Sequence, residues 1–230
     1  MLIGPQNSTL LVNHVRSRIR QAAEAAGRDP AAVTLVAVTK AQTAETIRLA
    51  ATAGVTDFGE NYLQEASGKM DQLADLALRW HFIGSIQSNK TRSIAERFDW
   101  VHSIDRLSVA RRLSEQRPFL KPPLNLCIQV ELVPEPTKSG VEPGEVRPLA
   151  AAAAQLPRVR LRGLMCVPPP QPNAMAARAV FARLRILLEE LNASGFELDT
   201  LSMGMSGDFE SAIAEGATLV RLGTALFGSR

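Results

Sequence analysis

The sequence has 230 residues, of which 46% are hydrophobic and 21% are charged, a composition typical of globular proteins and unlike that of disordered chains. The formal net charge is only +3, and the 26 lysines and arginines are interleaved with 23 acids, which argues against a nucleic-acid partner. The sequence has no apolar run of about 18 residues, no leader-like start and no zinc-ligand spacing around its two cysteines. We therefore expect a soluble, cytoplasmic protein with no membrane partner and no metal.

The first predicted element is a helix. Apolar residues recur at spacings of three and four, as on the buried face of an amphipathic helix: Leu11, Val15, Ile19, Ala22 and Ala26. The serine at 8 or the threonine at 9 is expected to cap its start, and the Gly-Arg-Asp-Pro sequence at 27–30 to end it.

A strand followed by a helix is the pattern that repeats through the rest of the chain. Strands are predicted at 33–39, 56–59, 79–83, 100–104, 124–131, 160–167, 200–202 and 218–222. Helices are predicted at 43–53, 62–76, 89–97, 106–116, 144–155, 173–193 and 209–215, and only a stub follows the last strand. This alternation predicts an α/β fold with a parallel sheet inside and helices outside.

Two closures of such a sheet compete. An open, doubly wound sheet normally has fewer strands and a Gly-x-Gly-x-x-Gly fingerprint after the first strand, which is absent here. Eight strand-helix units fit a (β/α)₈ TIM-type barrel better, so residues 1–230 are predicted to form a single barrel domain. The extra N-terminal helix is expected to cover the gap left by the missing last helix.

Barrel active sites gather at the carboxyl ends of the strands. The loops after the seventh and eighth strands often bind phosphate there, through backbone N–H groups that glycines leave accessible. These loops read Ser-Met-Gly-Met-Ser-Gly-Asp at 202–208 and Arg-Leu-Gly-Thr at 221–224. An ordinary strand-to-helix turn explains either loop alone, but both together favour a phosphate site.

Lys40 ends an apolar run rich in β-branched residues, Val-Thr-Leu-Val-Ala-Val-Thr at 33–39. A lysine in this position is most often a solvated surface residue. At the mouth of a barrel with a phosphate site opposite, however, a partly desolvated amine can attack an aldehyde and form a Schiff base. An aldehyde that also carries a phosphate indicates pyridoxal 5'-phosphate (PLP).

Motifs spread over nearly the whole chain carry a resemblance to a known family. They are Val-Thr-Lys at 38–40, Phe-Gly-Glu-Asn-Tyr at 58–62, Trp-His-Phe-Ile-Gly at 80–84, Gln-Ser-Asn-Lys at 87–90, Lys-Ser-Gly at 138–140, Arg-Gly-Leu-Met at 162–165, Leu-Ser-Met-Gly-Met-Ser at 201–206 and Arg-Leu-Gly-Thr-Ala-Leu-Phe-Gly at 221–228. Together they resemble the pyridoxal phosphate homeostasis protein family. The resemblance implies a fold-type III barrel like the N-terminal domain of alanine racemase. It also implies that the protein holds PLP and buffers or delivers it, without established turnover.

The resemblance also implies roles for seven residues and no catalytic one. Lys40 is similar to the Schiff-base lysine, and the rest of the implied cofactor site consists of Ser206, Gly223 and Thr224 at the phosphate, Arg221 at the pyridine nitrogen, and Asn61 and Met203 along the ring. Arginine stays protonated in proteins, so at the ring nitrogen it can only donate a hydrogen bond. An unprotonated pyridine is a weaker electron sink for carbanions.

Alanine racemase works with the same arginine, so a PLP-dependent amino acid racemase or related enzyme remains the alternative. A two-base racemase also needs a tyrosine from a second domain, whereas this sequence ends soon after its last motif and its single tyrosine, Tyr62, lies in a barrel loop. We therefore expect a non-catalytic, monomeric PLP-binding protein, with PLP-requiring apo-enzymes as candidate partners. A Schiff-base aldolase without PLP is disfavoured, because the lysine is on the first strand and the phosphate loops are on the last two.

Other polar residues are predicted to have structural roles. His81 is expected inside the barrel with a hydrogen bond, and His14 and His102 are expected to form no ligand set with it. Glu60 and Glu131 are expected to be ion-pair partners rather than an acid and a base. The basic turn that begins at Lys138 is expected at the rim.

Overall fold

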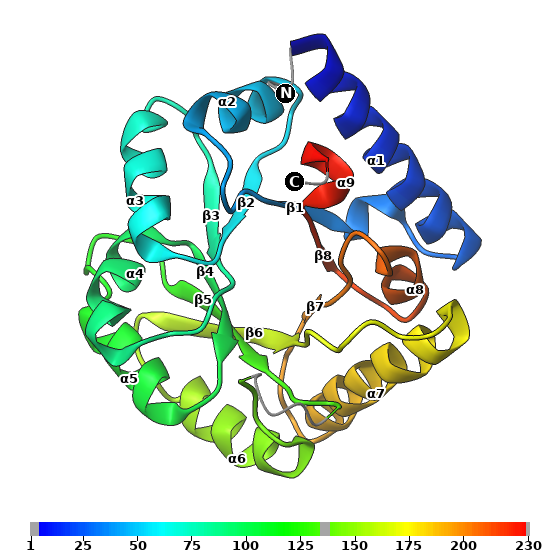
Figure 1. Ribbon diagram of the computed structural model, residues 1–230. Helices are drawn as coiled ribbons and strands as arrows, with labels where there is room; N and C mark the ends of the chain where they lie inside the picture. The colour runs from blue at the N-terminus through cyan, green and yellow to red at the C-terminus, as the bar shows by residue number, and fades with distance from the viewer. Residues whose placement is uncertain (1–4, 134–138, 229–230) are drawn as a thin grey trace.

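Eight parallel strands form the centre of the computed structural model, which describes residues 5–133 and 139–228. The strands are β1 (Thr34–Val38), β2 (Asp57–Glu60), β3 (Arg79–Phe82), β4 (Trp100–Ile104), β5 (Leu124–Gln129), β6 (Val159–Met165), β7 (Thr200–Ser202) and β8 (Leu219–Leu222). Each strand pairs with the next in sequence, and β8 pairs with β1, so the sheet closes into a barrel (Figure 1). The predicted α/β barrel is confirmed.

The helices lie outside the barrel. They are α1 (Pro5–Ala25), α2 (Ala44–Thr52), α3 (Leu63–Gln72), α4 (Thr91–Arg97), α5 (Leu107–Gln116), α6 (Pro143–Ala154), α7 (Ala174–Ala193), α8 (Phe209–Ala214) and α9 (Thr224–Phe227), with short 3₁₀ turns at Pro30–Ala32 and Ser88–Lys90. β4 and β7 match their predicted bounds residue for residue. α3 is the largest difference, since it ends at Gln72 and not near residue 76.

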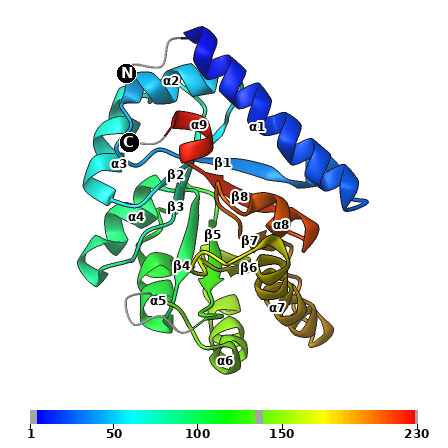
Figure 2. The same ribbon diagram turned by 45° about the vertical axis from the view of Figure 1, so that its right-hand side comes forward.

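The extra helix α1 completes the outer ring. It packs against α8, α9 and α2, and so covers the side of the barrel where α9 has only four residues (Figures 1 and 2). The predicted cover of the gap is confirmed.

The start and the buried face of α1 differ from the prediction. The helix begins at Pro5, so the expected cap at residue 8 or 9 is wrong, and Ser8 is instead a buried helical residue. The fully buried face is shifted by one position at several places, to Val12, Val15, Ile19 and Ala23. Neighbouring residues of a helix point about 100° apart. A spacing of three and four residues therefore fits more than one set of positions, and the spacing alone does not tell which set faces the core.

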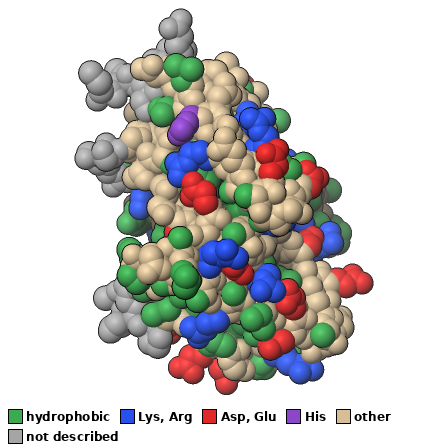
Figure 3. All heavy atoms as spheres, turned by 90° about the vertical axis from the view of Figure 1, so that its right-hand side faces the viewer, with side chains coloured by type: hydrophobic (Ala, Val, Ile, Leu, Met, Phe, Trp, Pro, Cys, Tyr) green, Lys and Arg blue, Asp and Glu red, His purple; other side chains and the backbone are tan. Residues whose placement is uncertain are grey.

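The apolar core lies mainly between the barrel and the helices. Phe58, Phe98, Phe181 and Phe209 are completely buried there. On the outer surface over α1, α7 and α8, basic and acidic side chains alternate (Figure 3) and form ion pairs, including Arg178 with Glu215. Among the described residues no helix is both long and apolar enough to cross a bilayer.

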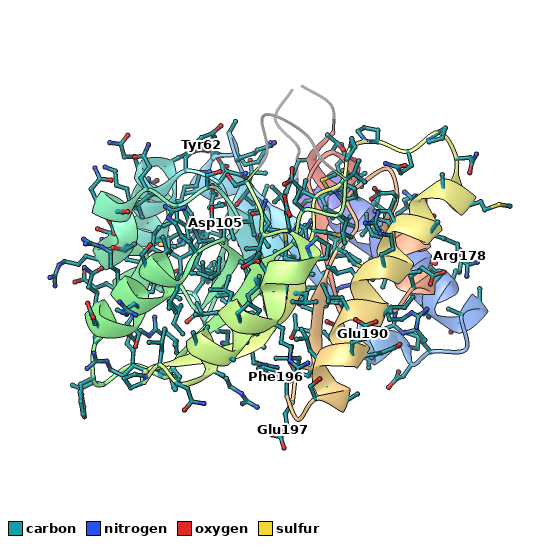
Figure 4. The ribbon with its side chains drawn as sticks, turned by 90° about the horizontal axis from the view of Figure 1, so that it is seen from below. Tyr62, Asp105, Arg178, Glu190, Phe196 and Glu197 are labelled. Atoms are coloured by element: carbon teal, nitrogen blue, oxygen red, sulfur yellow. The ribbon has the colours of Figure 1, made fainter. Side chains whose placement is uncertain are left out.

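The two ends of the barrel are easily told apart in a side view. Tyr62 and Asp105, which follow β2 and β4, lie at one end, and Phe196 and Glu197, which precede β7, lie at the other (Figure 4). We call the first end, where the carboxyl ends of all strands lie, the mouth.

Candidate functional site

The loops after β7 and β8 meet at the mouth. The Ser206 hydroxyl oxygen accepts hydrogen bonds from the Gly223 N–H at 3.3 Å and from the Ala225 N–H at 3.2 Å. We call residues 203–208 the β7 loop and residues 223–225 the β8 loop. The structure therefore brings together Ser206, Gly223 and Thr224, the three residues that the sequence assigns to a phosphate.

The lysine on the first strand lies beside these loops. β1 and β8 pair in register, with Val36 opposite Arg221. A side chain at Gly223 would come within 3.4 Å of the Val38 carbonyl oxygen, two residues before Lys40. Residues about 180 positions apart in sequence are thus neighbours, as the closed barrel predicts.

Lys40 itself lies on a tight turn directly after β1. The Gln42 N–H donates to the Thr39 carbonyl at 2.9 Å, and Ala41 has a φ of 59°. A left-handed conformation is unfavourable for a residue with a side chain, so surrounding contacts must hold this turn. Lys40 is exposed as a residue, and the partly desolvated amine that the sequence predicts stays a prediction.

A buried cluster holds the turn from below. Lys69 of α3 donates to the Thr39 carbonyl at 2.7 Å, to the Glu60 carboxylate at 2.8 Å and to the Glu65 carboxylate at 2.6 Å. The Thr39 hydroxyl donates to Glu60 at 2.6 Å, and the Ala41 N–H donates to Glu65. We call Thr39, Glu60, Glu65 and Lys69 the Lys69 cluster. It fixes the backbone on both sides of Lys40.

Charge in this cluster is unusually well buried. Lys69 is 6% exposed and Glu60 is fully buried. Burial raises the pKa of Glu60, although the hydrogen bonds from Lys69 and Thr39 act in the opposite direction. Glu60 is therefore the structural ion-pair partner that the sequence predicts. Lys69 was missed, and its only sequence signal is the four-residue spacing to Glu65 on one helix.

Arg221 is buried inside the barrel beneath the mouth. Its Nη1 donates to the Ser202 hydroxyl at 2.7 Å and its Nη2 to the Cys166 carbonyl at 2.8 Å. Burial lowers the pKa of this guanidinium, yet arginine starts so high that it remains a cation and a donor. Burial also raises the pKa of the Cys166 and Cys127 thiols to about 12, so neither is a nucleophile at neutral pH.

Asn61 follows directly after β2, the strand that pairs with β1 on the side away from β8. Its side-chain oxygen is buried and has no hydrogen-bond partner among the described residues. The backbone carbonyl oxygen of Asn61 would be only 2.1 Å from a Cβ at position 84, so only glycine fits at position 84. A hollow of about 560 Å³ opens beside it, with Tyr62, Gln87 and Lys90 in its lining.

The remaining predictions have mixed outcomes. Met203 is completely buried at the start of the β7 loop. His81 is an interior strand residue with hydrogen bonds, as predicted, and its partners are Asp57 at 3.0 Å and His102 at 2.9 Å, which the sequence did not indicate. No cluster of metal-ligating side chains occurs in the described part of the chain. Lys138 lies outside the described residues.

Comparison with known proteins agrees with this geometry. A sequence model described as alanine racemase, N-terminal domain, matches residues 12–230. Pyridoxal phosphate homeostasis protein from Pseudomonas aeruginosa is 62% identical over 94% of this chain and 93% of its own length. The chain belongs to the pyridoxal phosphate homeostasis protein family. The Escherichia coli K12 member of this family is 48% identical over 94% of both chains.

Solved structures extend the comparison to the fold. PipY from Synechococcus elongatus PCC7942 with PLP bound is 41% identical, with a TM-score of 0.82 over 92% of this chain and all of that one. Alanine racemase from Corynebacterium glutamicum is 19% identical, with a TM-score of 0.66 over 95% of this chain and 61% of that one. The second likeness shows the fold alone.

Proposed function

We propose that this member of the family binds PLP and takes part in PLP homeostasis, holding the cofactor as a Schiff base on Lys40. The observation that carries the proposal is the meeting of Lys40, the Ser206–Gly223 contact and Arg221 at one end of the barrel. The relatives named above support it, because they carry the homeostasis name and PipY has a structure with PLP bound.

The residues at the mouth fit a phosphorylated pyridine aldehyde. The β7 and β8 loops offer a hydroxyl at Ser206 and backbone N–H groups, which suit a phosphate. Arg221 offers a donor in a buried setting, which suits the unprotonated ring nitrogen. The unpaired oxygen of Asn61 is a buried acceptor that the hydroxyl group of the ring would satisfy.

The residues around Lys40 position its amine. Bound PLP supplies an aldehyde, and imine formation joins it to the amine with loss of water. The turn at residues 39–42 and the Lys69 cluster fix the backbone from which the amine extends. Glu60 and Lys69 form a buried ion pair at 2.8 Å beneath the turn, so we assign them an anchoring role and not proton transfer to a substrate.

The proposed role is to retain and deliver the cofactor rather than to turn over a substrate. The family name of the relatives supports this role. We further propose that residues 1–230 act as one monomeric barrel domain and that PLP-requiring apo-enzymes receive the cofactor from it.

The decisive experiment identifies the modified residue. The purified protein is loaded with PLP, reduced with borohydride and digested, and the labelled peptide is mapped. We expect a visible absorption band and a label on Lys40. Lys40→Ala should lose both, whereas Lys90→Ala, at a lysine of the same mouth, should keep both. A colourless wild-type protein, or a label on another lysine, contradicts the proposal.

A second assay addresses the enzyme alternative. Each amino acid enantiomer is incubated with the loaded protein, and inversion or loss is followed by chiral chromatography. We expect no turnover above that of free PLP. Sustained turnover that disappears in Lys40→Ala would make the protein an enzyme.

A further inference from the structure

Polar side chains occupy the middle of this barrel, where bulky branched apolar residues usually pack. Hydrogen bonds join His81 Nε2 to Asp57 Oδ1 at 3.0 Å, His81 Nδ1 to His102 Nε2 at 2.9 Å, and His102 Nδ1 to the Ser202 hydroxyl at 2.7 Å. Arg221 completes the series at 2.7 Å from Ser202. We call these five residues the interior network. Each of them is at most 4% exposed.

The interior network crosses the barrel. Asp57, His81 and His102 come from the adjacent strands β2, β3 and β4, and Ser202 and Arg221 from the adjacent strands β7 and β8. β5 and β6 separate β4 from β7 in the sheet (Figure 1). The hydrogen bond between His102 and Ser202 therefore spans the interior. The network thus links the lower end of β2 to the arginine below the mouth.

Neutral histidine rings and the chemistry of the two terminal residues together give a direction to every bond. Arg221 can only donate, so Ser202 accepts from it and still has its own proton to donate to His102 Nδ1. An ionised Asp57 can only accept, so His81 donates from Nε2 and accepts at Nδ1. His102 must then donate from Nε2 to His81 Nδ1. Each neutral ring then carries its proton on Nε2.

The surroundings of the histidines favour these neutral forms. Burial lowers the pKa of His81, with Asp57 and Asp99 acting against it and Arg79 with it. Burial also lowers the pKa of His102 to well below its usual range, assisted by His81 and Arg221. A proton added at His81 Nδ1 would face the His102 Nε2–H instead of an acceptor.

The lower end of the network is held by a surface arginine. Arg79 donates to Asp57 Oδ1 at 2.7 Å and to Oδ2 at 2.6 Å, and the Thr56 hydroxyl donates to Oδ2 at 2.7 Å. Burial alone would raise the pKa of Asp57, but the bonds from His81, Arg79 and Thr56 outweigh it and leave the pKa well below its usual range. Asp57 therefore stays an acceptor.

We propose that His81 and His102 are positioning residues. Held by Asp57, they accept the Ser202 proton at His102 Nδ1, so that the Ser202 oxygen accepts from Arg221. This contact orients the Arg221 guanidinium as the hydrogen-bond donor to the ring nitrogen of PLP. The inference rests on the proposed function for its consequence, but the network itself consists only of residues of this chain. Without the histidines Ser202 is free to rotate, and Arg221 loses one of its two acceptors described above, the Ser202 hydroxyl.

The first test needs no cofactor. The ¹⁵N chemical shifts of the histidine rings are measured in the protein without added PLP at pH 7. Two buried rings are expected as neutral Nε2–H tautomers, and Ser202→Ala should shift the His102 signal while leaving His14 unchanged. A charged ring, or an Nδ1–H tautomer for either histidine, overturns the inference whether or not PLP binds to Lys40.

The second test measures the consequence. The dissociation constant for PLP and the absorption maximum of the bound form are compared in His102→Phe, Ser202→Ala, Ser202→Thr and Trp100→Phe. In His102→Phe and Ser202→Ala, loss of the network should raise the dissociation constant for PLP about tenfold, which corresponds to one buried hydrogen bond. It should also shift the absorption maximum. Ser202→Thr keeps the hydroxyl and should restore both.

Trp100→Phe is the matched control. Trp100 stacks on His81 at 5.6 Å between ring centroids but makes no hydrogen bond in the network, so its variant perturbs packing alone and should keep the wild-type spectrum. If His102→Phe does not fold, Ser202→Ala carries the same comparison. Wild-type affinity and spectrum in Ser202→Ala overturn the positioning role, whereas a failure of wild type to label Lys40 overturns the proposed function instead.

Discussion

The two sides of the barrel mouth are held by different interactions. On the lysine side, the turn around Lys40 rests on the Lys69 cluster, in which a buried ammonium bonds Glu60 and Glu65. On the phosphate side, the β7 and β8 loops are joined by one uncharged hydroxyl, that of Ser206, and backbone N–H groups. The lysine side uses strong charges whose removal is costly, and the phosphate side uses neutral dipoles.

This difference suits the ligand that each side would meet. A buried carboxylate next to a phosphate would repel it, and the Lys69 cluster keeps its carboxylates beneath the turn and paired with a cation. Neutral N–H groups and a hydroxyl can bind an anion without a competing charge. The comparison therefore predicts large, pH-dependent effects on the lysine side and small, ligand-specific effects on the phosphate side.

Lys69→Met should have the largest effect. It leaves the Glu60 carboxylate buried without its cation, a change that typically costs about 3–5 kcal/mol of stability. Urea unfolding measures the loss. The matched control is Arg97→Met, which breaks a surface ion pair with Asp71 and should cost at most about 1 kcal/mol. Equal losses in the two variants would show that burial of the cluster contributes nothing.

Gly84→Ala tests the lysine side through backbone geometry. The new Cβ would lie 2.1 Å from the Asn61 carbonyl oxygen, so the end of β2 must shift, at about 1–3 kcal/mol or more. PLP affinity should fall with stability. Gly163→Ala makes a similar clash, with the Thr200 carbonyl at 1.8 Å, but at the amino end of β7. It should reduce stability and leave the affinity of the folded fraction unchanged; parallel losses of affinity would contradict this.

The cost of Lys69→Met should grow with pH. Burial already raises the pKa of Glu60, and loss of Lys69 removes an interaction that lowers it. A carboxyl whose folded pKa is raised contributes stability below its unfolded pKa and loses it as pH rises through the folded value. The gap to wild type should therefore widen between pH 5 and pH 8, by up to about 1.4 kcal/mol per pH unit while Glu60 stays protonated. A gap that is constant with pH would contradict a buried, unpaired Glu60.

Ser206→Ala should have the smallest effect on stability, about 1 kcal/mol, because one neutral acceptor is lost. Its effect should be specific to the phosphate: PLP should bind about tenfold more weakly, and pyridoxal, which has no phosphate, should be unaffected. Neither change should depend on pH between 5 and 8. Equal weakening for both ligands would mean that Ser206 orders the loops and does not contact the phosphate.

Sequence alone determined the fold and the location of the candidate site. Apolar periods of two and near 3.6 are local properties, so strands such as β4 and β7 were predicted residue for residue. Eight strand-helix units then predict a closed barrel, and closure places Lys40 beside Gly223 without any knowledge of side-chain contacts. The predicted cap of α1 was wrong because the helix extends back past Ser8 to Pro5, and a serine or threonine alone does not fix where a helix begins.

Tertiary structure alone decided which polar residues touch. The sequence gives no sign that Lys69 is buried; the packing of α3 against the barrel places its ammonium under the turn at Thr39. His81 and His102 lie 21 residues apart and Ser202 another 100 away, and only the register of the closed sheet brings them into one hydrogen-bonded series. Such contacts depend on distances set by the whole barrel, which no local pattern in the sequence encodes.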